Sequence, residues 1–219
     1  DISSLSNLKN LIKLDISLNP LRNFRPLGSL KQLRSLDISQ LENAQYATLP
    51  AMPELTELII KNSNLDKNID SLRPFLLSLK SLETLDLEGN NLDSYDYILA
   101  LAENPNSREV FSDELNTNVL FPNLKKLSLS KNNLTYIQKI RIFPLLEELD
   151  LSYNTGIMSF EPLTSLSKLR KLDLTGCSII DIDTLSKLQN LNWLCIAGTH
   201  SAEVSTLNKF KYLHYLDMS

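Results

Sequence analysis

The sequence predicts an α/β solenoid whose concave face is a parallel β-sheet and whose convex face carries short 3₁₀ or α-helical segments. A unit of 22 residues recurs along the chain, and each copy carries the pattern L-x-x-L-x-[L/I]-x-x-[N/S/C/T]. Self-similarity at such a period is typical of solenoids, in which each unit stacks on its neighbours and the whole displays a surface. The copies begin at Leu11, Leu33, Leu55, Leu82, Leu124, Leu146, Leu169, Leu191 and Leu213.

Each unit is expected to contain one short strand, because its leucines alternate with polar residues. Leu149 and Leu151 are two residues apart and therefore face the same side of a strand, whereas Asp150 between them faces the other side. One unit cannot bury its own leucines. Stacking places Leu149 between Leu127 and Leu172, so a continuous core and a parallel sheet form only when several units stack.

The polar residue after each strand is expected to hold the turn. An asparagine amide that points inward can satisfy backbone groups that would otherwise be buried without partners. The equivalent positions are Asn19, Leu41, Ser63, Asn90, Asn132, Asn154, Cys177 and Thr199. Leu41 has no polar group to offer, so a local distortion is expected there.

The return half of a unit is too short for more than a turn of 3₁₀ or α-helix. Residues 24–27 and 160–163 share one form of it, F-x-P-L. The unit from Leu55 is longer, with 27 residues, and residues 69–79 place apolar side chains on one helical face. A true α-helix is expected there on the convex side, capped by Ser71 and with Pro74 in its first turn.

The unit from Leu82 is 42 residues long and carries an insertion at about 93–122. Ser94 is expected to cap a helix over 95–102, which Asn104-Pro105 ends. Residues 104–121 show no repeat pattern. One interpretation is a projecting loop that contacts a partner. The other is a convex-side insertion without a binding role, partly packed by Val110, Phe111, Leu115 and Leu120.

Two columns of outward-facing residues are expected on the concave sheet. The first, named here the aspartate column, reads Asp15, Asp37, Ile59, Asp86, Ser128, Asp150, Asp173, Cys195 and Asp217. Carboxylates on adjacent strands, such as Asp150 and Asp173, repel unless they are compensated. The column is therefore either a negative stripe for a basic peptide or a cation, or an ordinary feature of the repeat. In the second case it is balanced by cations in the flanking columns, which are Lys125, Lys126, Lys131, Arg170 and Lys171.

The second column, named here the mixed column, places two aromatic residues side by side near the C-terminal end. It reads Lys13, Ser35, Glu57, Thr84, Lys126, Glu148, Lys171, Trp193 and Tyr215. Tyr153 and His214 are expected near the same end. Exposed Trp and Tyr are enriched at the centres of protein interfaces. The pair is therefore a candidate anchor for a partner, unless a following segment of the chain covers both rings.

Composition argues against several other classes. The chain has 219 residues, of which 42% are hydrophobic, and a net charge of −4, so it has enough apolar residues for a core and no basic excess for nucleic acid. No run of 18 apolar residues predicts a membrane span. Two histidines, five glycines and no nucleophile or phosphate-loop motif argue against an enzyme, and no ligand spacing predicts a metal or other cofactor.

Two cysteines inform the expected compartment. Cys177 takes the inward turn position and Cys195 faces the opposite side from Leu194 and Ile196, so no disulfide is expected between them. Free thiols favour a reducing, cytoplasmic location. A secreted or cell-surface location is the alternative, which a glycan at the sequon Asn133-Leu134-Thr135 would support. The chain stops in mid-repeat at Ser219, and a fragment of a longer protein is expected.

These motifs make the chain resemble leucine-rich repeat proteins over roughly residues 5–219. The 22-residue unit and the F-x-P-L-x-x-L form are similar to those of the internalins and of the regulatory subunits of protein phosphatase 1. The resemblance implies one curved solenoid of about nine repeats over residues 1–219. We expect a non-catalytic scaffold that binds a protein along its concave face, through Trp193, Tyr215 and Tyr153. The alternatives are an adhesion or receptor ectodomain and the regulatory arm of a larger enzyme.

Overall fold

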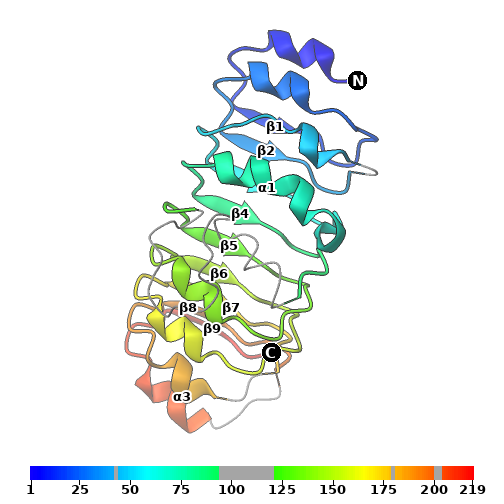
Figure 1. The fold of residues 1–219 in the computed structure, drawn as a ribbon. Coiled ribbons are helices and arrows are strands. Elements are labelled where there is room, and N and C mark those ends of the chain that lie inside the picture. Colours follow the sequence, from blue (N-terminus) through cyan, green and yellow to red (C-terminus); the bar gives the residue numbers. More distant parts are fainter. Residues whose placement is uncertain (42–43, 94–120, 179–180, 200–203) are drawn as a thin grey trace, which may run out of the picture.

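The computed structural model describes residues 1–41, 44–93, 121–178, 181–199 and 204–219. These residues form a curved solenoid in which nine strands make one parallel sheet, in chain order from one end to the other (Figure 1). The strands are β1 (Lys13–Asp15), β2 (Ser35–Asp37), β3 (Glu57–Ile59), β4 (Thr84–Asp86), β5 (Lys126–Ser128), β6 (Glu148–Asp150), β7 (Lys171–Asp173), β8 (Trp193–Cys195) and β9 (Tyr215–Asp217). The fold class predicted from the repeat is therefore confirmed.

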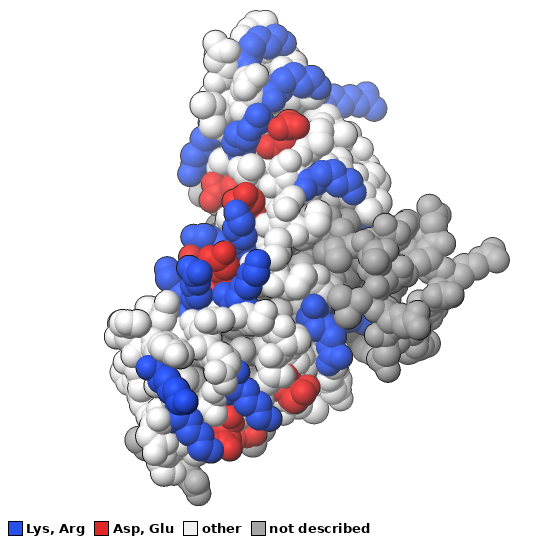
Figure 2. Space-filling view, turned by 90° about the vertical axis from the view of Figure 1, so that its left-hand side faces the viewer, with Lys and Arg blue, Asp and Glu red and all other residues white. Residues whose placement is uncertain are grey.

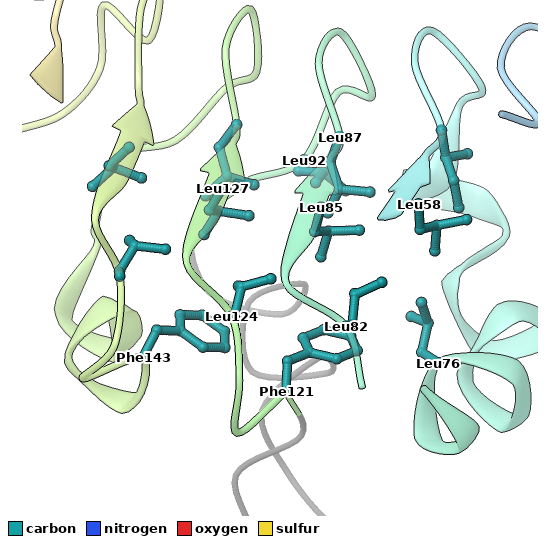
Figure 3. Packing of buried hydrophobic residues seen from close by; sticks show 14 of the residues in the cluster. Leu58, Leu76, Leu82, Leu85, Leu87, Leu92, Phe121, Leu124, Leu127 and Phe143 are labelled. Carbon is teal, nitrogen blue, oxygen red and sulfur yellow. The ribbon is translucent and has the colours of Figure 1, made fainter. Parts of the chain in front are cut away.

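The pairing register is the one that the leucine pattern predicts. Leu149 pairs with Leu127 of β5 and with Leu172 of β7, and every other strand pairs through the equivalent residues. The middle leucines of β2 to β8 are buried, and so are aromatic residues that precede the strands, such as Phe121 and Phe143. Figure 3 shows this stacking for Leu58, Leu85 and Leu127, with Phe121 and Phe143 below them.

Short helical segments return the chain from one strand to the next. Those of 3₁₀ type are η1 (Ser3–Asn7), η2 (Arg25–Ser29), η3 (Tyr46–Thr48), η4 (Leu65–Lys67), η5 (Gln138–Ile142), η6 (Glu161–Ser165) and η7 (Val204–Lys209). The F-x-P-L segments thus give η2 and η6, each with its proline in the first turn, where a missing N–H costs no hydrogen bond. A four-residue helix, α3 (Ile182–Leu185), begins after Asp181, whose carboxylate accepts from the Thr184 N–H.

The longer helix predicted near residues 69–79 is present as α1 (Ile69–Ser78). Its expected start was wrong, because the helix already includes Ile69 and Ser71 does not cap it. The Ser71 hydroxyl instead donates to the Asn68 carbonyl, and Pro74 lies in the second turn. Burial of Ile69 and Leu72 against the core favours the earlier start.

Buried asparagines hold the turns as predicted. The Asn132 carboxamide oxygen accepts from the N–H groups of Asn90 and Leu92, and its NH₂ group donates to the carbonyls of Leu87, Leu129 and Ser130. Asn90 and Asn154 donate to carbonyls in the same way, and their oxygens accept from the N–H groups of Ser63 and Leu134, respectively. We call Asn90, Asn132 and Asn154 the asparagine ladder.

The residue before the polar turn position of each unit, or before Leu41 in the second unit, has a left-handed backbone, which was not predicted from the sequence. Its N–H donates to a carbonyl of the next unit, as Tyr153 does to Thr175, so the turn extends the parallel pairing beyond the strand. These residues are Leu18, Gln40, Asn62, Gly89, Lys131, Tyr153, Gly176 and Gly198, with φ between 47° and 69°. Non-glycine residues rarely adopt this conformation.

The distortion expected at Leu41 does not appear in the described residues. Leu41 is buried, and Gln40 keeps the left-handed conformation of the other units. The Ser63 hydroxyl accepts from the Gln40 N–H, and the Ser39 hydroxyl accepts from the Lys61 N–H, so serine hydroxyls hold the turn. Residues 42–43 lie outside the described part of the chain.

Most of the predicted insertion also lies outside the described residues. This applies to the helix expected over 95–102 and to the packing expected from Val110, Phe111, Leu115 and Leu120. At the two ends of the gap, Asp93 forms a parallel bridge with Asn133, and Phe121 is buried in the core.

Candidate protein-binding face

The aspartate column occupies the predicted line along the sheet, with Asp150 paired to Asp173 across β6 and β7. Its carboxylates also have a local role. Asp150 Oδ1 accepts from the Ser152 N–H at 2.9 Å and from the Ser152 hydroxyl at 2.6 Å. Asp173 holds Thr175 in the same way, and the other column aspartates accept from the N–H two residues ahead. Each carboxylate therefore stabilises the turn that follows its strand.

Of the two alternatives for this column, balance by the five flanking cations is not what the described residues show. Lys126 and Lys171 both point to Glu148 of the mixed column, with Nζ–Oε1 distances of 2.9 and 3.6 Å. Lys125, Lys131 and Arg170 likewise pair with glutamates. Among the described residues, Asp86 is the one column member with an ion pair, to Lys61 at 2.7 Å. Glutamate reaches the lysines of adjacent strands, whereas the shorter aspartate is held at its own turn.

Asp150 is consequently an uncompensated carboxylate in a half-buried position. Burial raises its pKa above the ordinary value, the two bonds from Ser152 lower it, and the neighbouring Asp173 and Asp86 raise it further. Asp15, at the exposed end of the same column, has its pKa lowered by its hydrogen bonds to Ser17. The same residue type thus has opposite electrostatic effects at two positions of one column.

Replacing Asp150 with asparagine is expected to stabilise the protein at pH 7, because the amide oxygen still accepts from Ser152 while the buried charge is removed. The folded pKa of Asp150 lies above the unfolded value of about 3.9, so the parent loses stability as pH rises through this window. The gain from the substitution should therefore be full at pH 7 and vanish near pH 3. Urea unfolding of parent and variant at both pH values measures it.

Asp15→Asn is the matched control with the opposite sign. The lowered pKa of Asp15 in the parent contributes stability that is present above the unfolded pKa and is lost as pH falls. The Asp15→Asn variant lacks this contribution and should be less stable than the parent at pH 7. Equal effects of the two substitutions at pH 7 would contradict the assigned environments.

Trp193 and Tyr215 form a stacked pair on the concave face. Their strands are adjacent, their ring centroids are 4.9 Å apart and the ring planes differ by 3°. Tyr215 is 45% exposed and Trp193 is half-buried. His214, also exposed, directly precedes Tyr215. The structure therefore brings Trp193 and Tyr215 into contact, with His214 next to Tyr215 in the chain.

Tyr153 lies elsewhere. It is the left-handed turn residue after β6, at the end of the strands opposite to Trp193. Its ring covers Gly176 of the next turn, where a Cβ would lie 3.0 Å from Tyr153 Cδ1, and Lys131 Nζ lies 6.0 Å from the ring centroid. Tyr153 is 53% exposed. It belongs to the turn edge of the solenoid and not to the aromatic pair.

A shallow hollow of about 370 Å³ joins the two columns in the middle of the concave face. The carboxylates of Asp150 and Asp173 and the ring of Trp193 all line it. The full lining is Thr84, Leu85, Asp86, Lys126, Leu127, Ser128, Glu148, Leu149, Asp150, Lys171, Asp173 and Trp193. The sequence predicted the columns but gave no sign of this hollow.

Both thiols are free and buried. Cys177 donates to the Leu151 carbonyl from the predicted inward position, and burial raises its pKa to about 11. Cys195 is in the predicted column, but its Sγ lies 3.0 Å from the Thr175 hydroxyl and little of it reaches solvent. A buried thiol with a raised pKa, such as that of Cys177, is a poor nucleophile.

The described residues show no metal site and no membrane-spanning helix. No three His, Cys, Asp or Glu side chains there lie close enough together to hold a metal ion. No helix in that part of the chain has the length and apolar character needed to cross a membrane.

Figure 2 shows one side of the molecule, on which Lys and Arg side chains lie in separate groups, several of them beside Asp or Glu.

Comparison with known proteins agrees with the repeat pattern. The family model described as leucine rich repeats in two copies matches residues 122–165, and a single leucine rich repeat matches residues 81–110. Toll-like receptor 2 of Boselaphus tragocamelus is 29% identical over 156 residues, 70% of this chain. Tubulin-specific chaperone E of Mus musculus is 30% identical over 159 residues, 68% of this chain. The matches span only 16% and 27% of those two proteins.

Two solved structures of Listeria monocytogenes internalins share the fold. The internalin inlF superimposes with a TM-score of 0.69 at 22% identity, over the whole of this chain and 57% of that one. Internalin C2 gives 0.66 at 23% identity, over 94% of this chain and 80% of that one. The repeats, the asparagine ladder and these matches establish that the chain is a leucine-rich repeat protein with an internalin-like solenoid.

Proposed function

We propose that the chain is a non-catalytic scaffold that binds a partner protein on its concave face, with the Trp193–Tyr215 pair as the anchor. The observation that carries the proposal is this stacked, solvent-accessible pair beside the hollow. Aromatic rings bury a large area with little loss of side-chain freedom, and they dominate the binding energy of many interfaces. Because the two rings already stack on each other, little ordering remains to oppose binding.

The double variant Trp193→Ala, Tyr215→Ala is expected to lose a partner that the parent retains. Truncation of aromatic anchors commonly costs about 2 kcal/mol or more each, which weakens binding more than about 100-fold for the pair. Immobilised parent and variant should be compared by pull-down from lysate with mass spectrometry. The variant must keep the parent's far-ultraviolet circular dichroism spectrum.

The matched control removes two exposed tyrosines from outside the strands, Tyr136→Ala and Tyr212→Ala. It should capture the same protein as the parent. If the aromatic variant captures that protein equally well, the anchor lies elsewhere and the proposal fails. If every protein that the parent captures is also captured by the Trp193→Ala, Tyr215→Ala variant, or if the parent captures none, the concave face is not the binding surface.

We place this activity in the cytoplasm, because two free thiols without a disulfide suit a reducing compartment. The similarity to a tubulin-specific chaperone agrees with this location. The similarity to a Toll-like receptor favours the alternative, a secreted or cell-surface protein. Asn133 is exposed and would be open to glycosylation. A glycan on Asn133 of the native protein would overturn the cytoplasmic assignment.

We also propose that residues 1–219 act as one binding unit, with no nucleic-acid partner, since the net charge is −4. The remaining alternative is the regulatory arm of a larger enzyme. An intact mass of the native polypeptide large enough for a further domain would favour that alternative.

A further inference from the structure

We propose that the partner inserts an arginine side chain into the concave hollow, where its guanidinium bridges the carboxylates of Asp150 and Asp173 beside the Trp193 ring. This inference rests on the proposed function and names the chemistry that the same face recognises. Trp193 lines the hollow together with Asp150 and Asp173, two carboxylates without an ion pair among the described residues, and Tyr215 stacks on Trp193 beside it.

The two carboxylates are arranged to receive one cation. They pair in register on adjacent strands, which lie about 4.8 Å apart. Each uses its Oδ1 atom for the turn, through Ser152 and Thr175, and the structure gives the Oδ2 atoms no partner among the described residues. Two acceptor oxygens thus remain, one on each side of a gap that a guanidinium can span.

The cations already on this face leave the position open. Lys126 and Lys171 flank the hollow, but both pair with Glu148, and Lys61 pairs with Asp86 and Glu88. Lys126 and Lys171 share the Glu148 carboxylate, and Lys61 has two carboxylates, so the charge of all three lysines is at least partly balanced and repels an incoming cation less. Within the part of the chain that the structure describes, no lysine or arginine forms an ion pair with Asp150 or Asp173.

Arginine fits this site better than lysine for two reasons. Its planar fork donates parallel hydrogen bonds to two acceptors at once, whereas an ammonium is a point charge. Its flat, weakly hydrated group also stacks on aromatic faces, and Trp193 lines the same hollow. An arginine that occupies the hollow would place the partner's backbone across β6 to β8, within reach of Tyr215.

The test uses a blocked peptide of four arginines, with peptides of four lysines and four citrullines as comparators. Trp193 is the only tryptophan, so its fluorescence reports occupancy of the hollow directly. The arginine peptide is expected to change the fluorescence saturably. The citrulline peptide, which has nearly the same shape without the charge, should not bind, and the lysine peptide should bind about tenfold more weakly or worse.

The decisive variant is Asp150→Asn, Asp173→Asn, which retains an amide oxygen for Ser152 and Thr175. It should bind the arginine peptide at least about tenfold more weakly than the parent. The matched control is Asp15→Asn, Asp37→Asn, another in-register pair of the same column with the same change in net charge, outside the hollow. Its affinity should equal that of the parent.

Three results would overturn the inference: no saturable binding of the arginine peptide, equal binding of the lysine peptide, or equal losses in the two aspartate variants. The pull-down separates this failure from failure of the proposed function. If a partner is lost by Trp193→Ala, Tyr215→Ala but retained by Asp150→Asn, Asp173→Asn, the scaffold function stands and the arginine site falls.

Discussion

Replacing Asn132 with leucine is expected to lower the free energy of unfolding by about 2–6 kcal/mol. Asn132 is buried, and its oxygen accepts from two backbone N–H groups, those of Asn90 and Leu92. Leucine matches the volume but accepts no hydrogen bond, so both N–H groups would stay buried without a partner. Each such group costs about 1–3 kcal/mol. The loss of three donated bonds to carbonyls adds to this effect.

Urea unfolding of Asn132→Leu at pH 7 measures the effect, with Asn19→Leu as its control. Asn19 occupies the equivalent place in the first unit, but it is exposed and donates only to Ile16 and Ser17. Water can replace those bonds, so this variant should lose less than about 1 kcal/mol. Similar losses in the two variants would mean that burial does not set the importance of the ladder. Leu41 already shows that one unit can form its turn through serine hydroxyls instead.

The sequence predicted the strands and their register because a single physical requirement decides both. Every unit must bury the same leucines, and a shift by one residue would expose them to solvent. Leu149 therefore lies between Leu127 and Leu172, and Trp193 beside Tyr215, as expected. The outward-facing columns follow from the same register without further assumptions.

The partners of the charged side chains could not be predicted in the same way. Alternation places Lys126 and Lys171 next to the aspartate column, but it does not say which carboxylate they reach. In the structure Glu148 takes both lysines, whereas Asp150 is held by Ser152 two residues ahead. The D-x-[S/T] spacing, in which a carboxylate accepts from the N–H two residues on, was a signal in the sequence for this outcome.

Tyr153 was misplaced for a similar reason. Its position relative to the strand fixes it in the turn, but a left-handed tyrosine is unusual, and the glycines at Gly89, Gly176 and Gly198 were the only sequence sign that the turn requires this conformation. The hollow was also invisible in the sequence. It depends on how far the sheet curves, which follows from the sizes of the strand and return segments of many units together.

Leu149→Ala is expected to destabilise the protein by about 2–5 kcal/mol. Leu149 is 2% exposed and pairs on both sides with buried leucines of β5 and β7, so removal of three carbon atoms leaves a cavity that rigid neighbours cannot fill. Stability in a solenoid is approximately a sum of units and nearest-neighbour interfaces, and this substitution weakens two interfaces at once.

Leu216→Ala provides the matched comparison within the same row of leucines. Leu216 is 37% exposed in β9 and pairs on one side only, with Leu194. The same chemical change there removes less buried area and creates no closed cavity, so a loss below about 1.5 kcal/mol is expected. Chemical denaturation of both variants gives the two values. Equal losses would mean that the leucine row does not carry the interfaces between units, and the register on which the concave site depends would then be wrong.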